Sequence, residues 1–198
     1  MKPFSILLML TFSLCASLCC PGEEEATQFN ISNDNLVQIE NNATVFAVDD
    51  FLVIETIIPN NQTTVDGQTI QLSNLFYDDV LSESFLEHSL SLYLETQFGT
   101  RSPIQLTEEV VFADEGMVNL SNEIIRVLQG YDEASNSFRS RIRIQLKESG
   151  TLFLGGRGSF AQSNAIEIYG GIYELGFANI STTIRNANAQ GLYEFVVE

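Results

Sequence analysis

Residues 138–147 (FRSRIRIQLK) have the clearest period of two in the sequence, with one mainly apolar and one polar set of side chains. Successive side chains of a β-strand point to opposite faces, so the pattern predicts a strand with one buried and one exposed face. The face expected to be buried carries Phe138, Ser140, Ile142, Ile144 and Leu146. The other face carries Arg139, Arg141, Arg143, Gln145 and Lys147. We expect the three arginines to lie opposite acidic residues of a neighbouring strand, because such pairs stabilise a sheet.

From residue 36 onward the chain contains a series of such segments. Those expected to form strands are residues 44–59, 68–75, 85–98, 109–113, 124–128, 138–147, 151–154, 165–169, 173–184 and 192–197. Apolar residues of 44–59 occupy both parities, which predicts either one strand buried on both faces or two strands bent at Asp49-Asp50. Short helical turns are expected near residues 77–84 and 162–164, and no long segment has a sustained helical period.

These segments, with turn residues between them, predict an all-β protein with an antiparallel β-sandwich. Residues 146–154 (LKESGTLFL) resemble the strand-turn-strand corner of immunoglobulin-like sandwiches, so an immunoglobulin-like arrangement is one form that this sandwich could take. A β-barrel is the alternative, because the glycine pairs at 155–156 and 170–171 could bend strands around a corner.

The composition limits the class of protein and its partners. The chain has 198 residues, of which 26 are acidic and 9 are basic, and its formal net charge is −17. Hydrophobic residues make up 44% of the chain, a share that is ordinary for a globular domain and excludes the disordered class. This length suits a single domain with a sizeable core. Nucleic acid is excluded as a partner, because so few cations cannot neutralise its phosphates.

The first twenty residues have the plan of a secretory signal peptide. Lys2 supplies a positive charge, an apolar run extends over residues 4–18, and Pro21-Gly22 ends the segment. This run is too short to span a bilayer comfortably, which favours a signal peptide over a membrane helix. A buried N-terminal helix or strand is the alternative.

All three cysteines lie in this leader, at Cys15, Cys19 and Cys20. The sequence ASLCC at 16–20, followed by PGEEE at 21–25, resembles the leader and acidic tether of surface lipoproteins of the Bacteroidota. The resemblance implies that Cys19 or Cys20 is acylated and holds the protein to a membrane, at the outer membrane or cell surface. Plain secretion is the alternative. We expect a lipoprotein-type signal peptide at 1–20, an acidic flexible tether at 21–35 and a single β-sandwich domain at 36–198.

The sequence offers few groups for catalysis. His88 is the only histidine, and it shares a parity with Leu86 and Leu90, so we expect a half-buried strand residue. No serine lies in a Gly-x-Ser-x-Gly motif, and the glycine-rich segment 155–159 (GGRGS) lacks the features of a phosphate-binding loop and is expected to form a wide turn. We therefore expect no catalytic residues, no metal and no cofactor.

Two kinds of side chain remain as candidates for binding a ligand. Acidic pairs occur at 49–50, 78–79, 108–109, 114–115 and 132–133, and we expect them mainly to form an acidic surface. Exposed tyrosines could form a platform for a sugar, and the candidates are Tyr77, Tyr131, Tyr169, Tyr173 and Tyr193. The sequence thus predicts a non-catalytic binding or structural module with a glycan or protein ligand. The alternative is a carboxylate-dependent hydrolase acting on glycans.

Replacement of both Cys19 and Cys20 by serine tests the anchor. Each buried methylene of an acyl chain contributes ~0.8 kcal/mol to membrane binding, so the wild-type protein should enter the detergent phase on phase separation and the double variant should stay in the aqueous phase. A double variant that is processed and remains membrane-bound like the wild type would show that the lipoprotein interpretation is wrong.

Overall fold

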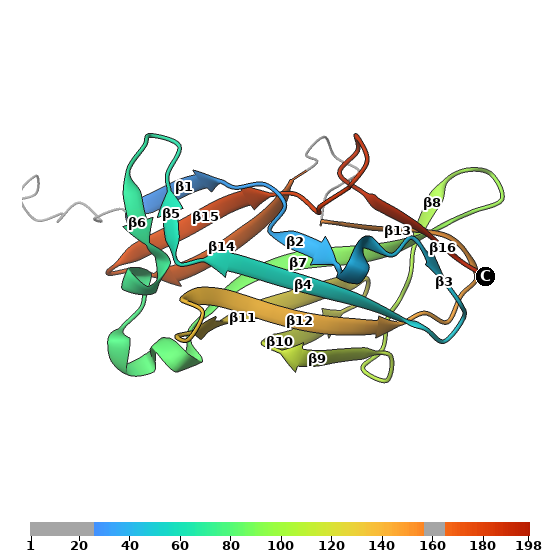
Figure 1. Cartoon of the computed structure of the whole chain (residues 1–198), viewed down its shortest axis with the longest axis horizontal. Helices are drawn as coiled ribbons and strands as arrows, with labels where there is room; N and C mark the ends of the chain where they lie inside the picture. The colour runs from blue at the N-terminus through green and yellow to red at the C-terminus, as the bar shows by residue number, and fades with distance from the viewer. Residues whose placement is uncertain (1–25, 157–164) are drawn as a thin grey trace, which may run out of the picture.

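The computed structural model describes residues 26–156 and 165–198, and nearly all of its regular structure is β-strand (Figure 1). The strands of the first half are β1 (Gln28–Ser32), β2 (Val37–Ile39), β3 (Val45–Phe46), β4 (Phe51–Pro59), β5 (Asn61–Thr63), β6 (Thr69–Gln71), β7 (Phe85–Glu95) and β8 (Arg101–Pro103). Those of the second half are β9 (Val111–Glu115), β10 (Met117–Ser121), β11 (Ile124–Asp132), β12 (Ser137–Gln145), β13 (Gly150–Gly156), β14 (Ile166–Ile172), β15 (Gly176–Thr182) and β16 (Tyr193–Val197). Short 3₁₀ turns lie at Glu40–Asn42, Leu72–Leu75 and Asp78–Glu83, and the last of these confirms the helical turn predicted near residues 77–84.

One large sheet curls to form the body of the protein. Its main strand order is β1-β15-β14-β7-β11-β12-β4-β2, and most pairs are antiparallel. The sheet curls far enough for Val37 of β2 to form an isolated bridge with Ile184, two residues after β15. Strands β13, β16 and β3 extend the sheet from the second half of β7. This arrangement confirms the predicted all-β, antiparallel β-sandwich.

The inward faces of the strands share one core. On β4 the buried residues are Leu52, Ile54, Thr56 and Ile58, which follow the period of two. On β12 the predicted inward residues Phe138, Ser140, Ile142 and Ile144 are all buried. Burial of each large apolar side chain stabilises the fold by about 1.5–3 kcal/mol, so this continuous core is the main source of stability.

Residues 44–59 form two strands with a bend at Asp49-Asp50, which confirms the second of the two predicted alternatives. Strands β3 and β4 are separated by a turn in which Asp49 has a φ of 75°. The Asp50 carboxylate accepts a hydrogen bond of 2.8 Å from the Ala47 backbone N–H. This local bond explains why the chain bends at the acidic pair.

The predicted boundary of the flexible tether is wrong, because residues 28–32 are part of the sheet. β1 pairs in parallel with β15, and Ile31 is buried in the core. The apolar residues Phe29 and Ile31 alternate with polar ones, which is typical of a strand. The run is short and closely follows the acidic residues 23–25, so the sequence did not distinguish it from the tether. The cysteines and the rest of the leader lie outside the described residues.

The arginines of β12 form ion pairs with acids of the neighbouring strands, as the sequence predicts, although only Arg141 lies directly opposite acids in the register. Arg141 binds Glu55 of the neighbouring β4, and its Nη2 lies 2.6 Å from Glu40 Oε1. On the other edge of β12, Arg143 Nε lies 2.8 Å from Asp114 of β9, and Arg139 Nε lies 3.6 Å from Glu115. The guanidinium of Arg143 also lies over the rings of Phe51 and Phe112, at 5.1 and 5.5 Å from their centroids.

A fork in the sheet separates β11 from β12. The two strands pair directly only at 130–132 and 137–139, and beyond this point β10 pairs with β11 while β9 pairs with β12. Gly116 joins β9 to β10 at the fork, with a φ of 75°. A Cβ at this position would lie 2.3 Å from the carbonyl oxygen of Leu128, so only glycine fits there.

Gly116→Ala should therefore destabilise the protein more than Gly67→Ala, which serves as its control. Both residues have positive φ, but a Cβ on Gly67 would meet no atom within 4 Å. We expect Gly67→Ala to cost about 1–2 kcal/mol from the backbone conformation alone, and Gly116→Ala to cost about 1–3 kcal/mol more from overpacking. Urea denaturation measures both free energies of unfolding, and equal losses would show that the fork tolerates a side chain.

Candidate functional site

A polar groove crosses the outer face of β14, β7 and β11. It encloses about 300 Å³ and is lined by Glu87, His88, Ser89, Arg126, Glu167 and Tyr169. The odd-numbered residues of the first half of β7 point away from the core, which places Glu87 and Ser89 on this face. The register sets Arg126 of β11 beside Ser89 and Tyr169 of β14 beside Glu87.

The charged groups of the groove are partly paired and open to solvent. Arg126 Nε lies 3.9 Å from Glu87 Oε2, and their side chains are 56% and 45% exposed. The Ser181 hydroxyl donates a hydrogen bond of 3.1 Å to Glu167 Oε1. These groups present fixed hydrogen-bond acceptors and a cation to a ligand.

Tyr169 is the aromatic residue of the groove, and the residue is 48% exposed. Partial burial, followed by the negative charge of Glu167, raises the pKa of Tyr169 above its ordinary value. The phenol is therefore neutral at physiological pH, with a hydroxyl that donates or accepts a hydrogen bond and a ring face available for stacking. Gly170 follows directly and packs against β7, where a Cβ would lie 2.3 Å from Leu86 Cδ2.

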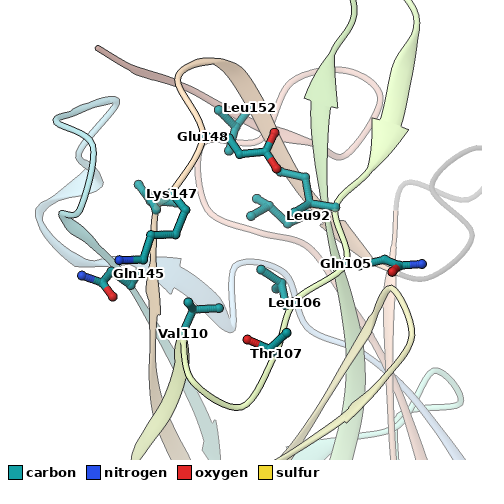
Figure 2. Close-up of a pocket in the computed structure, with 11 residues that line it drawn as sticks. Leu92, Gln105, Leu106, Thr107, Val110, Gln145, Lys147, Glu148 and Leu152 are labelled. Carbon is teal, nitrogen blue, oxygen red and sulfur yellow. The ribbon is translucent and has the colours of Figure 1, made fainter.

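A second, apolar pocket lies at the end of the sandwich, between the loop after β8 and the turn between β12 and β13 (Figure 2). We call it the end pocket, and its volume is about 210 Å³. Its lining residues are Leu92, Ile104, Gln105, Leu106, Thr107, Val110, Gln145, Leu146, Lys147, Glu148 and Leu152. The side chains of Leu92, Leu106 and Val110 face a common space (Figure 2).

The tyrosines singled out in the sequence do not form one platform. Tyr77 and Tyr173 are 49% and 56% exposed, but they do not line the groove, and Tyr131 is half-buried. The expectation that Tyr193 is exposed is wrong: it is 1% exposed, and its hydroxyl donates a hydrogen bond of 3.0 Å to the Ala43 carbonyl. Only strand register, which the sequence does not show directly, places Tyr169 beside Glu87 and puts Arg126 on the other side of β7 in the same groove.

His88 is more deeply buried than the sequence predicts. It is 2% exposed rather than half-buried, because it lies on the inward face of β7 with Leu86 and Leu90 and so is part of the core layer. Its Nδ1 lies 2.9 Å from Gln129 Nε2, and its Nε2 has no hydrogen-bond partner within the described residues. Burial lowers the pKa of His88 to about 4, against a smaller raising effect of the hydrogen bond with Gln129.

The described residues contain no group of three or more histidine, cysteine or acidic side chains that could hold a metal ion. Residues 155–156 of the glycine-rich segment lie in β13, and residues 157–159 lie outside the described part, as do Cys15, Cys19 and Cys20. Within residues 26–156 and 165–198, no helix is long and apolar enough to cross a membrane.

No protein-family model matches the chain, and no curated protein matches it either. In structure, it is similar to a type II cohesin domain from the cellulosome of Acetivibrio cellulolyticus, with a TM-score of 0.34 and 11% sequence identity. The similarity covers 82% of this chain and 95% of the cohesin domain. At this TM-score and identity, the similarity does not identify a shared function.

The buried His88 should make the protein less stable in mild acid. In the unfolded chain its pKa is near 6.5, so between pH 6.5 and about 4 the unfolded state binds a proton that the folded state does not. The free energy of unfolding should fall by about 3 kcal/mol from this residue as the pH drops through that window. Urea denaturation from pH 7.5 to 4.5 measures the fall, and His88→Gln, which cannot titrate, should reduce it. Equal slopes for the two proteins would contradict the assignment.

Proposed function

We propose that the protein is an exported, lipid-anchored module of the cell envelope that binds a glycan without catalysing its hydrolysis. The single observation that carries the binding function is the groove over β14, β7 and β11, where Tyr169 lies among Glu87, Ser89, Arg126 and Glu167. The export and the anchor are proposed from the leader and from Cys19 or Cys20.

The chemistry of the groove suits a neutral sugar. A pyranose ring has an apolar face that stacks on an aromatic ring, and its hydroxyls both donate and accept hydrogen bonds. Glu87 and Glu167 supply acceptors, Arg126 supplies donors, and Tyr169 supplies the exposed ring. Because the groove is open and its side chains are solvated, we expect weak and reversible binding.

The two carboxylates of the groove also motivate the hydrolase alternative, but their surroundings favour binding. A glycosidase needs one carboxylic acid whose pKa is raised, usually by burial in an apolar site. The Glu87 side chain is 45% exposed and paired with Arg126, and Glu167 accepts a hydrogen bond from Ser181. Neither carboxylate therefore lies in the buried, apolar surroundings that a catalytic acid of this kind requires.

Tyr169→Ala tests the site, with Tyr77→Ala as its matched control. Both tyrosines are about half-exposed, but only Tyr169 lines the groove. On a microarray of plant, algal and bacterial oligosaccharides, the wild type should bind at least one class. Loss of stacking should weaken that binding about tenfold, or about 1.4 kcal/mol, in Tyr169→Ala and leave Tyr77→Ala unchanged.

Two results would overturn the proposal. Equal binding by Tyr169→Ala and the wild type would exclude the groove as the site, and binding to no glycan would exclude this ligand class. Release of reducing ends by the wild type, abolished by Glu87→Gln or Glu167→Gln, would instead establish the hydrolase.

A further inference from the structure

We propose that the end pocket is a docking site for a short basic peptide segment of another protein, one of whose large apolar side chains fills the pocket. This inference does not depend on the groove, which lies on the outer face of β14, β7 and β11 and shares no lining residue with the end pocket.

The pocket is built from the end of the core. Leu92, Leu146 and Leu152 form its deepest part and are each no more than 2% exposed. Leu106 and Val110, from the loop after β8, are half-buried, so apolar surface is left uncovered at the mouth.

Two backbone hydrogen bonds hold the loop over the end of the sandwich. The Ile104 N–H donates to the Leu92 carbonyl at 2.8 Å, and the Gln145 N–H donates to the Val110 carbonyl at 2.8 Å. The loop is thus fixed to β7 at one end and to β12 at the other, and the pocket between them is formed before any ligand arrives. A preformed site binds without the cost of ordering a loop.

The volume of about 210 Å³ indicates the size of the occupant. It is below the ~300–1,000 Å³ of typical small-molecule sites. A cavity of about 150 Å³ accommodates benzene. One leucine-sized or phenylalanine-sized side chain therefore fits, and the rest of the ligand must lie on the rim. That arrangement is typical of a peptide with a single apolar anchor.

The rim is acidic, which indicates the charge of the partner. Glu148 lines the mouth itself (Figure 2). Glu108 and Glu109 lie in the chain between the lining residues Thr107 and Val110, and all three acids are exposed. No salt bridge to these three acids is present among the described residues, whereas the one cation of the lining, Lys147, lies 2.6 Å from Asp49 Oδ1. Lysine or arginine residues flanking the apolar anchor would meet this uncompensated charge.

The same charge argues against the other occupants. A second copy of this chain would bring a further formal charge of −17 to the contact, and an anionic lipid surface would meet the acidic rim unfavourably. The net negative charge of the chain attracts a basic peptide before the two molecules touch, so it also speeds their association.

Fluorescence anisotropy with a labelled peptide Lys-Lys-Ala-Leu-Ala-Lys-Lys tests the proposal, using the chain without its leader. We expect saturable binding at 20 mM salt, at least tenfold weaker binding of the peptide with Glu in place of every Lys, and several-fold weaker binding of the peptide with Ala in place of Leu. Leu106→Gln, which makes the pocket polar at nearly constant size, should weaken the binding several-fold.

The charge of the rim is tested by a matched pair of triple variants. Glu108→Lys/Glu109→Lys/Glu148→Lys changes the rim, and Asp78→Lys/Asp79→Lys/Glu83→Lys makes the same change in net charge at the opposite end of the molecule (Figure 1). The rim variant should lose at least tenfold in affinity and the control less than threefold, with thermal unfolding confirming that both are folded.

Equal losses in the two triple variants would show that the peptide binds by net charge alone and would overturn the proposal. Two further outcomes would also overturn it, by assigning the pocket to another occupant. One is a dimer in sedimentation equilibrium that Leu106→Gln abolishes, and the other is binding to phosphatidylcholine–phosphatidylglycerol vesicles that the same substitution removes.

Discussion

Strand β7 is hydrogen-bonded along both of its edges, and this pairing fixes the faces of the strands around it. One edge pairs with β11 and β8, and the other pairs with β14 and β13. The inward residues of β7 are held in the core. Because successive side chains of a strand point to opposite faces, the positions of its outward residues are set as well. Glu87 and Ser89 lie in the polar groove, whereas Tyr93 is covered by Phe153 and Leu192. Leu92 contributes to the end pocket, so the same strand supports both candidate sites.

The pairing of cations with acids determines which charged groups of the surface are left to interact with a partner. Most of the described cations are paired with acids of this chain. Arg141 contacts three acids at once, which are Glu40, Glu55 and Asp114. Arg101, a further cation, lies over the ring of Phe153 at 4.1 Å from its centroid. Each exposed pair contributes little to stability, about 0–1 kcal/mol. Their larger effect is on recognition, because the remaining acids dominate the surface at both ends of the sandwich.

The sequence predicted those features that depend on local periodicity. The two faces of β12, the ion pairs of its arginines and the bend at Asp49-Asp50 all follow from side-chain alternation and turn chemistry. Features that depend on which strands become neighbours were not predicted. β1 joins the sheet by parallel pairing with distant β15, and β10 lies in the fork beside β11. The groove was missed for the same reason, since Glu87, Arg126 and Tyr169 are far apart in the chain and only the register brings them together.

The early start of β1 has a consequence for how the molecule would sit on a membrane. Because the sheet begins at Gln28, an anchor at Cys20 would be joined to it by a linker of only about eight residues, which spans at most on the order of 30 Å. β1 enters the sheet at the end of the molecule opposite the turn between β12 and β13 (Figure 1). A body held so closely by that end would point its end pocket away from the bilayer and present the groove sideways, toward whatever lies along the cell surface.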